Sequence, residues 1–482
     1  MSRHDAKPLL IGGEWIAEGA DTITSVNPAS GQVNYEVCAA TARHVDAAVE
    51  VAQRAASAGA WRDMLPHKRA RLLAKLADIV EARAEPLART QMLENGKVLA
   101  ECRAQAQSAA ATFRYYAAVC ETLGSEVTPS RGQYWSMTVY EPYGVVAAIT
   151  PWNSPLTMEA QKLAPALAAG NAVVLKPSEV TPSVGLALGQ AALDAGIPAG
   201  IVNVLPGTGG VAGDALIRHP GVKFVSFTGG TASGRRIAAI AAEKLMPAAL
   251  ELGGKSPHIV FADADLEAAA KAVADGIFEA CGQSCVAGSR LFVERRVYER
   301  VLDRVIERAR SLRIGLPDAA EAELGPLASF AHRERVERYV ATARAEGGEI
   351  VAGGQRPENG GLSRGAYYLP TVVARLASSA TVCQQEIFGP VLCALPFDDE
   401  EDLLRQANES AYGLAAGIWT GDYRRAWRVA RRLEAGTVWI NTYKQLSIST
   451  PFGGFKDSGI GREKGTAGLR LYQQAKSLYF GL

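Results

Sequence analysis

The chain has 482 residues, of which 48% are hydrophobic and 21% charged, and its formal net charge is +1. This length predicts two to four domains, and the small net charge gives no general electrostatic reason to bind nucleic acid or an anionic membrane. The first residues contain no apolar signal segment and no stretch of about 18 apolar residues occurs, so we expect a cytoplasmic protein. Seven thinly spread cysteines favour free thiols in a reducing compartment over a disulfide scaffold.

Strand-like and helix-like segments alternate from residue 144 onward. GVVAAIT at 144–150 precedes Ser154 and Pro155, which suit the N-cap and first residue of a helix. Further strands are predicted at 172–176, 200–205, 222–227, 249–254 and 258–261, with helices at 155–169, 181–195, 210–218 and 232–245. The alternation predicts a parallel sheet covered on both faces, which is the architecture of dinucleotide-binding domains.

A second series begins near residue 266 and predicts a second α/β layer. The helices are expected at 266–281, 297–312, 400–409 and 423–434, and the strands at 289–295, 349–353, 413–419 and 437–441. The helix at 423–434 is rich in arginine, but its apolar positions Ala426, Val429, Ala430 and Leu433 predict an ordinary amphipathic surface helix. We therefore expect no nucleic-acid partner.

Several familiar kinds of site are not indicated. No two of the six histidines lie close in sequence, and neither HExxH nor CxxC occurs, so no metal is expected. The G-x-S-x-G motif of a serine hydrolase does not occur either.

Two glycine-rich turns each follow a predicted strand and open a helix, at 207–212 (GTGGVA) and 228–234 (TGGTASG). Either could present backbone N–H groups to a pyrophosphate, and either could be only a tight βα turn, so the residues alone leave the choice open. The stretch KPSE ends another strand, where Lys176 and Glu179 could bind the hydroxyls of an adenosine ribose. The alternative is a surface ion pair.

Two cysteines lie four residues apart in EACGQSC. Helical periodicity places Cys281 on the apolar side of a helix that we expect to stop at Gly282, which predicts a core residue. Cys285 falls in the following turn, where nearby backbone donors could lower the pKa of its thiol. Cys285 is then either a nucleophile or an inert loop cysteine.

Seven strings in one order, PWNSP, KPSE, FTGGTASG, ELGGKSP, GQSC, EIFGPV and PFGGFKDSGIGRE, resemble the NAD(P)-dependent aldehyde dehydrogenase superfamily, as do IGGEW and NPASG near the start. The resemblance covers nearly the whole chain. It implies a Rossmann-type NAD-binding domain at 1–120 and 143–252 and a second α/β catalytic domain at 253–464. A small β arm and tail at 121–142 and 465–482 would mediate oligomerisation, as a homodimer or homotetramer.

The resemblance assigns chemical roles by position. Cys285 corresponds to the nucleophile, Glu251 to the base that activates water, and Asn153 to the side-chain donor of the oxyanion hole. Lys162 and Glu463 correspond to a proton relay behind that base. Cofactor contacts are implied at Trp152, Lys176, Glu179, Gly209, Phe227, Thr228, Gly229, Gly230, Leu252, Glu386 and Phe388.

In the family the phosphates lie near 228–234, and 207–213 borders the adenine. Gly230 stands where the commoner motif has serine, and Ala232 where it has an acidic residue, so one phosphate contact is lost. NAD is favoured over NADP because the Glu179 carboxylate would repel a 2′-phosphate.

The wall of the substrate tunnel is implied by the same resemblance. Ser154 and Gln161 replace bulkier aromatic residues, which predicts a roomier and partly polar tunnel. We expect a bulky, aromatic or semialdehyde substrate. Lys444 could meet a distal carboxylate, although a solvated surface lysine is the interpretation that we favour. The tunnel residues are Ser154, Met158, Gln161, Ser284, Val286, Leu446 and Ile448.

The sequence thus predicts NAD-dependent oxidation of an aldehyde to an acid, through a thiohemiacetal and a thioester on Cys285. Water activated by Glu251 would hydrolyse the thioester, and the family pattern around Glu251 implies that the acyl group is not passed to coenzyme A. Two alternatives remain, a binding protein that lost turnover and a thiol hydrolase that needs no nicotinamide.

Overall fold

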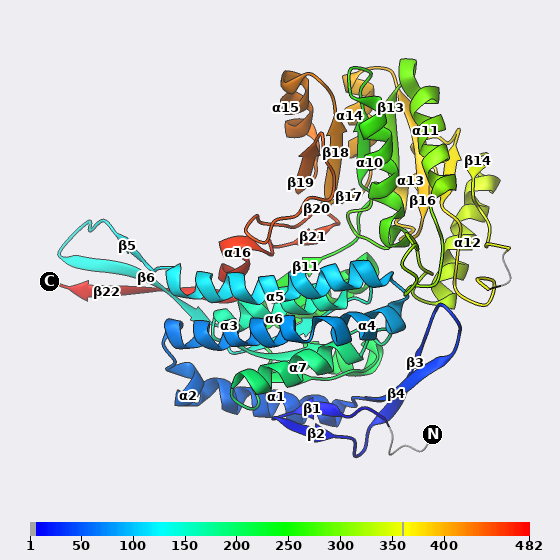
Figure 1. The fold of residues 1–482 in the computed structure, drawn as a ribbon. Coiled ribbons are helices and arrows are strands. Elements are labelled where there is room, and N and C mark those ends of the chain that lie inside the picture. The colour runs from blue at the N-terminus through cyan, green and yellow to red at the C-terminus, as the bar shows by residue number, and fades with distance from the viewer. Residues whose placement is uncertain (1–5, 359–360) are drawn as a thin grey trace.

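The computed structural model describes residues 6–358 and 361–482, which form two α/β lobes and a projecting arm (Figure 1). The first lobe contains an eight-stranded sheet of order β2-β1-β9-β8-β7-β10-β11-β21. Its five central strands are parallel, and the antiparallel strands β1, β2 and β21 complete its edges. The strands are β1 (Leu9–Ile11), β2 (Glu14–Ile16), β7 (Val145–Ile149), β8 (Ala172–Lys176), β9 (Val202–Val204), β10 (Phe224–Thr228), β11 (Ala248–Glu251) and β21 (Gly459–Ile460).

Helices cover this sheet because its central strands are almost wholly apolar and buried. Every residue of β7 and β8 is buried, as expected for a parallel sheet with both faces covered. Pro155 begins α6 as predicted, since its fixed φ suits a first helical position. The helices are α1 (Ala42–Ser57), α2 (Gly59–Arg62), α3 (Pro66–Ala82), α4 (Ala84–Asn95), α5 (Leu99–Thr122), α6 (Pro155–Ala168), α7 (Ser183–Ala195), α8 (Asp214–Arg218) and α9 (Thr231–Glu243), with a π-helical turn at Gly209–Gly213.

The second lobe contains a seven-stranded sheet of order β14-β15-β16-β13-β12-β18-β19, parallel except for β14. Its strands are β12 (Pro257–Val260), β13 (Arg290–Glu294), β14 (Glu349–Ala352), β15 (Thr371–Ala374), β16 (Val391–Phe397), β18 (Ala415–Trp419) and β19 (Thr437–Ile440). Its helices are α10 (Leu266–Phe278), α11 (Tyr298–Ser311), α12 (Phe330–Ala345), α13 (Thr381–Gln384), α14 (Glu400–Asn408) and α15 (Tyr423–Arg432), with 3-10 turns at Glu279–Gly282 and Arg295–Val297.

Three features of the second lobe differ from the sequence-based expectations. The strand at 258–261, which closed the first predicted series, pairs with β13 and β18 in the second sheet. The helix expected to reach residue 281 ends at Phe278. Strands β15 and β16 and helix α12 were not predicted. Helix α15, in contrast, is the expected surface helix. Its Arg425, Arg428 and Arg432 form ion pairs with Asp263, Glu400 and Glu401, respectively.

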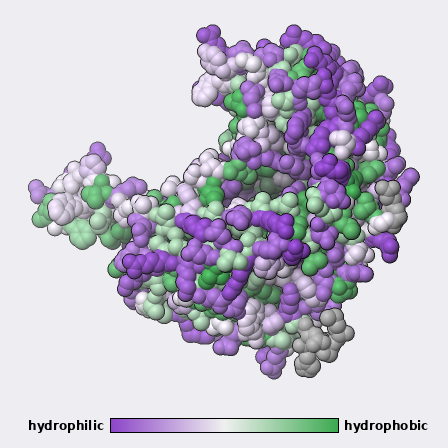
Figure 2. Space-filling view, viewed as in Figure 1, coloured by the Kyte–Doolittle hydropathy of each residue, from purple (hydrophilic) through white to green (hydrophobic). Residues whose placement is uncertain are grey.

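A three-stranded antiparallel sheet forms the arm, which projects from the first lobe (Figure 1). Its strands are β5 (Glu126–Thr128), β6 (Tyr134–Pro142) and β22 (Gln473–Gly481), and β22 pairs with β6 along its whole length. Large hydrophobic side chains on the arm are exposed, namely Val127, Trp135, Tyr479 and Phe480. Figure 2 shows green, hydrophobic surface on this arm at the left of the view. The remaining elements are β3 (Asp21–Val26), β4 (Val33–Ala39), β17 (Tyr412–Gly413), β20 (Phe455–Lys456) and α16 (Gly465–Arg470).

Each lobe has its own hydrophobic core, so the two sheets are packed independently. A small third cluster, which includes Val286, Leu414 and Phe452, packs against Cys285. Within the described residues, none of the helices combines the length and the apolar character that a bilayer span needs.

Candidate active site

A cavity of about 420 Å³ opens where strand ends of the first sheet meet loops of the second lobe. Its lining comes from the segments after β7, β10 and β11 and from the loops that precede β13 and β16. Cys285 and Glu251, distant in sequence, lie on the same cavity. The predicted site residues that line it are Trp152, Asn153, Met158, Thr228, Gly229, Gly230, Glu251, Leu252, Cys285, Glu386 and Phe388.

Cys285 lies in a turn, as predicted, but the chain reaches it differently. Three consecutive residues have positive φ, namely Ala280 (54°), Cys281 (53°) and Gly282 (68°). This left-handed segment ends helix α10 three residues before the predicted stop, because a right-handed helix cannot continue through it. Cys281 is nevertheless buried in the core, as expected, and its Sγ donates to the carbonyl of Gly325 at 2.9 Å.

The surroundings of the Cys285 thiol correct one expectation. Burial, together with the carboxylates of Glu251 and Glu386, raises the pKa of Cys285 to about 12, whereas the turn had suggested that backbone donors could lower it. Both causes disfavour the thiolate, since a buried anion loses hydration and meets like charge. The thiol therefore needs a base beside it, and the Glu251 carboxylate is close enough to influence its titration.

Glu251 ends β11 and is 5% exposed. Among the described residues neither of its carboxylate oxygens has a hydrogen-bond partner. Burial, and then the negative charge of Glu463, raises the pKa of Glu251 well above its ordinary value, while Lys162 opposes the shift. A buried carboxylate with a raised pKa is the state that a general base at neutral pH requires.

Lys162 and Glu463 are brought together behind Glu251. Lys162 Nζ lies 2.7 Å from Glu463 Oε1, and it also donates to Ser226 Oγ at 3.0 Å. Gln161 belongs to the same buried network, since its amide donates to the other oxygen of Glu463. Gln161 was expected to face the substrate tunnel, but it is 4% exposed, its amide is held by this carboxylate, and it does not line the cavity.

Asn153 follows β7 and approaches the cysteine loop. Its Nδ2 donates to the carbonyl of Gln283 at 2.9 Å, which places the amide beside the backbone that leads to Cys285. Trp152 packs edge-on against the Phe388 ring with centroids 5.3 Å apart. Phe388 itself has a positive φ of 61°. Glu386, two residues earlier, accepts the N–H of Gly254 at 3.0 Å, and burial raises its pKa to about 6.

A second cavity, of about 400 Å³, adjoins the first and shares Trp152 and the turn at 228–230 with it. Both glycine-rich turns line it, so the two candidate phosphate loops face one space. Its predicted residues are Trp152, Lys176, Glu179, Gly209, Phe227, Thr228, Gly229 and Gly230. Lys176 is buried, with Nζ 3.3 Å from the half-exposed Glu179 carboxylate.

The residues of this second cavity fit a dinucleotide. The Thr228 hydroxyl is buried, and it has no partner among the described residues. A Cβ at Gly230 would meet nothing within 4 Å, whereas one at Gly229 would lie 2.5 Å from the Phe227 ring. The turn thus leaves open space where a backbone-bound phosphate would lie.

The other expected tunnel residues differ in how far they are exposed. Ser154 Oγ accepts from Gln105 Nε2 at 3.0 Å and from Lys97 Nζ at 3.5 Å, so its hydroxyl is not a free polar wall. Val286 is buried, Ser284 and Ile448 are half-buried and Leu446 is exposed. Lys444, expected as a solvated lysine, has a side chain only 17% exposed and pairs with Glu279 at 3.4 Å.

Some lining residues were not found from the sequence. His332, Arg335, Tyr339 and Tyr412 also border the first cavity. His332 had been weighed only as a metal ligand; its Nε2 lies 2.7 Å from the carbonyl of Phe388, and burial lowers its pKa to about 4. A neutral imidazole that donates to this carbonyl supports the left-handed conformation of Phe388. No sequence motif reveals this contact. No cluster of three or more metal-binding side chains occurs in residues 6–358 and 361–482.

Comparison with known proteins identifies this arrangement. Residues 15–478 match the model of the aldehyde dehydrogenase family. Phenylacetaldehyde dehydrogenase of Pseudomonas fluorescens is 43% identical over 479 residues, covering 98% of this chain and 95% of that protein. DhaS of Bacillus subtilis (strain 168), named as an aldehyde dehydrogenase, is 41% identical over 479 residues, covering 99% of this chain and 96% of that protein.

A solved structure agrees with the sequence comparison. The NAD⁺ complex of the Bacillus cereus aldehyde dehydrogenase superposes with a TM-score of 0.96 at 40% identity, covering 99% of this chain and 97% of that one. The match extends over both lobes and the arm. The chain therefore belongs to the aldehyde dehydrogenase family.

Proposed function

We propose that this enzyme oxidises an aldehyde to a carboxylic acid with NAD⁺ and without transfer to coenzyme A. The convergence of Cys285, Glu251 and Asn153 on one cavity carries the proposal, since these are a nucleophile, a base and an amide donor. A second cavity suited to a dinucleotide adjoins it. The similar Bacillus cereus enzyme was solved with NAD⁺.

The residues that would hold NAD⁺ come from both lobes. Lys176 and Glu179 would bind the adenosine ribose, and the turn at 228–230 would bind the phosphates through backbone N–H groups. Glu386 and Phe388 would hold the nicotinamide end beside Cys285. When bound, NAD⁺ supplies the hydride acceptor for the oxidation.

The chain's own groups carry the rest of the reaction. Glu251 takes the proton of the Cys285 thiol as the sulfur adds to the carbonyl carbon, and the Asn153 amide and the backbone N–H of Cys285 stabilise the oxygen that takes the electron pair. After oxidation the acyl group is a thioester on Cys285. Glu251 then takes a proton from water, whose oxygen attacks the thioester carbon and expels the thiolate. Lys162 and Glu463 lie behind this base to carry its proton away.

The proposed substrate is a bulky, aromatic or semialdehyde compound. Ser154 is small, and Met158 presents an adaptable apolar side chain to the cavity. The relative that is 43% identical is named for phenylacetaldehyde. Because Gln161 is turned into the buried network, the polar tunnel wall rests on fewer residues than the sequence predicted.

The arm is proposed to join copies of the chain into a homodimer or homotetramer. Trp135, Tyr479 and Phe480 expose apolar surface on a sheet that projects from the body. Such surface is ordinarily covered by a partner. Sedimentation analysis of the purified protein tests this, and a monomer at micromolar concentration would contradict it.

One assay tests the proposed activity. Absorbance of NADH or NADPH is followed with a panel of acetaldehyde, phenylacetaldehyde, benzaldehyde and succinic semialdehyde, with NAD⁺ and NADP⁺ in turn. We expect NADH formation, with kcat/KM for the larger aldehydes well above that for acetaldehyde. Ester hydrolysis without any oxidation would instead indicate a thiol hydrolase, and neither activity would indicate a binding protein.

A further inference from the structure

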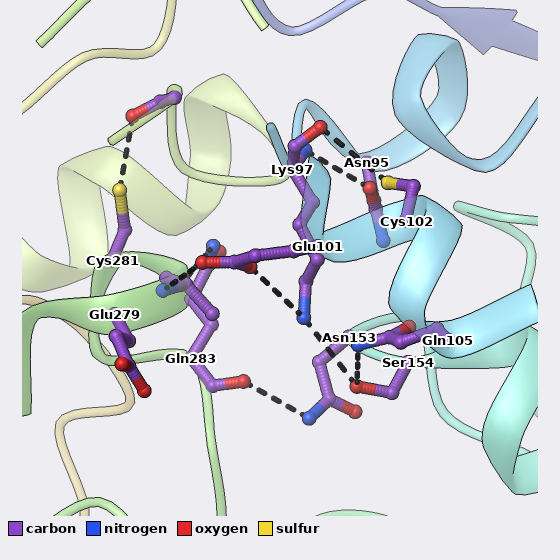
Figure 3. A network of polar contacts seen from close by, with 12 residues as sticks. Asn95, Lys97, Glu101, Cys102, Gln105, Asn153, Ser154, Glu279, Cys281 and Gln283 are labelled. Carbon is purple, nitrogen blue, oxygen red and sulfur yellow. Dashed lines mark hydrogen bonds and ion pairs between the residues drawn. The ribbon is translucent and has the colours of Figure 1, made fainter. Parts of the chain in front are cut away.

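The cysteine loop is held from the opposite lobe by a side chain that neither the motifs nor the mechanism uses. Glu101 lies in the first turn of α5, in the first lobe. Its Oε1 accepts the backbone N–H of Ala280 at 3.1 Å, across 179 residues of sequence. Figure 3 shows the Glu101 side chain extending between Lys97 and the segment that carries Cys281 and Gln283.

Ala280 is the first of the three left-handed residues before the nucleophile. Its N–H is taken by Glu101, and its carbonyl accepts both the backbone N–H and the side-chain Nε2 of Gln283, each at 3.1 Å. Alanine and cysteine rarely adopt positive φ, so surrounding contacts have to fix this conformation. Glu101 supplies such a contact at the start of the segment, and it comes from the first lobe.

The residue that follows this segment, Gln283, contacts Asn153, the side-chain donor of the oxyanion hole. The carbonyl of Gln283 accepts Asn153 Nδ2 at 2.9 Å, and Gln283 Oε1 accepts the N–H of Ala328 at 2.9 Å. A shift of Ala280 therefore moves Gln283, and with it both the Asn153 amide and the position of Cys285 two residues later.

The Asn153 side of the site is held by the neighbours of Glu101. Asn95 Nδ2 donates to the carbonyl of Trp152 at 3.1 Å, and Gln105 Nε2 donates to Ser154 Oγ at 3.0 Å. Lys97 Nζ lies 3.7 Å from Glu101 and 3.5 Å from Ser154 Oγ, so it links the two sides. Residues 95–105 thus contact the residues on either side of Asn153 and the start of the segment that leads to Cys285 (Figure 3).

We propose that Glu101 is a positioning residue for the reaction, which holds the left-handed Ala280–Gly282 segment so that Cys285 and the Asn153 amide converge on one substrate oxygen. The proposal rests on the function proposed above. It requires the hydrogen bond to Ala280 rather than the charge of Glu101. Removing the acceptor is expected to lower the rate of every reaction of Cys285 and to leave NAD⁺ binding nearly unchanged.

The test compares Glu101→Ala with Glu101→Gln, whose amide oxygen can still accept the Ala280 N–H. The readouts are kcat for aldehyde oxidation, kcat for hydrolysis of 4-nitrophenyl acetate without cofactor, KM for NAD⁺ and the melting temperature. For Glu101→Ala we expect both kcat values to fall by about 10- to 100-fold, with KM for NAD⁺ within about 2-fold. Glu101→Gln is expected to stay within about 3-fold of the wild type in both reactions.

Two further variants make the test specific. Glu50→Ala removes another helical i,i+4 ion pair, Glu50–Arg54, which is exposed and has no part in the proposed reaction. It is expected to leave both kcat values and KM for NAD⁺ unchanged. Ala280→Gly added to Glu101→Ala is expected to recover part of the lost kcat, because glycine adopts positive φ without help. If Glu101→Ala does not fold, Glu101→Met, which has no strong acceptor, replaces it in the comparison.

Three results would overturn the proposal. They are wild-type kcat values in Glu101→Ala, equal losses in Glu101→Gln and Glu101→Ala, or a lowered melting temperature with unchanged kcat per folded enzyme. If the wild type hydrolyses the ester but oxidises no aldehyde, the proposed function fails while the ester readout still tests Glu101.

Discussion

The two sheets present opposite ends of their strands to the same site. In the first lobe the lining groups lie at or after the strand ends: Trp152 and Asn153 after β7, Thr228 at the end of β10 with Gly229 after it, and Glu251 at the end of β11. In the second lobe they precede the strands, with Cys285 before β13, and Glu386 and Phe388 before β16. Carboxyl ends of parallel strands are the general ligand edge of an open α/β sheet. Only the first lobe follows that rule.

This difference explains which groups can be located from general principles. Groups after a strand, such as Lys176 and Glu179, are expected at a binding edge once the strand is recognised. Groups before a strand sit in loops whose shape depends on the other lobe. Asn153 bonding to Gln283, Glu101 bonding to Ala280 and Glu386 bonding to Gly254 are among the contacts that hold the second-lobe loops at the site.

The largest expected effect tests the second lobe's contribution. Cys285→Ala should lower both aldehyde oxidation and ester hydrolysis by on the order of 10⁴-fold or more, because it removes the nucleophile. NADH formation and 4-nitrophenolate release measure the two activities. The control is Cys281→Ala, which removes the Sγ contact to Gly325 and should lower the free energy of unfolding by about 1–2 kcal/mol in urea titration while leaving kcat near wild type. The reverse pattern would exchange the roles of the two cysteines.

The matching change in the first lobe is Glu251→Gln. Without the base, thioester hydrolysis should slow by about 10²- to 10⁴-fold, whereas the first NADH should form with a smaller loss because solvent can still take the proton of the Cys285 thiol. Rapid mixing should therefore show a burst of about one NADH per active site followed by a slow phase. A uniform loss with no burst would place Glu251 before the oxidation step instead.

The pH dependence sharpens the assignment of Glu251. Burial and Glu463 raise the pKa of Glu251 well above its ordinary value, so the base form becomes populated only as pH rises. We expect kcat of the wild type to increase from acidic through neutral to alkaline pH, and the increase to be lost in Glu251→Gln. The effect on stability has the opposite sign. Because the pKa of Glu251 is higher in the folded than in the unfolded state, its contribution to the free energy of unfolding is fully present below the unfolded pKa and is lost as pH rises through the folded pKa. A wild-type kcat that is independent of pH over this range would contradict the assignment.

A smaller effect is expected at the adenosine end of the first sheet. Glu179→Gln removes a half-exposed negative charge that faces the cofactor cavity. The ratio of kcat/KM for NADP⁺ to that for NAD⁺ should rise by about 10-fold, since repulsion of a 2′-phosphate is relieved. Steady-state assays with both cofactors measure the ratio, and an unchanged ratio would show that Glu179 does not contact the ribose.

The smallest effect concerns the turn after β10. Gly230→Ser places a side chain in open space and offers a hydroxyl to the cofactor phosphates, so KM for NAD⁺ should fall by about 3-fold. Gly229→Ala is the matched contrast, because its Cβ would lie 2.5 Å from the Phe227 ring and should raise KM. Equal effects of the two substitutions would mean that the turn is not the phosphate cradle.

The sequence by itself determined the family, the alternation of strands and helices, and the residue types of the site. The buried strands at 145–149 and 172–176 were recognisable because a continuous apolar run is typical of a buried parallel strand and is visible in the local sequence alone. The tertiary structure decided the rest, because it depends on groups distant in the chain. The raised pKa of Cys285 comes first from burial and then from Glu251 and Glu386, Gln161 turns inward to reach Glu463, and α10 ends early in a left-handed segment whose first N–H is held by Glu101. Local periodicity carries no information about such partners.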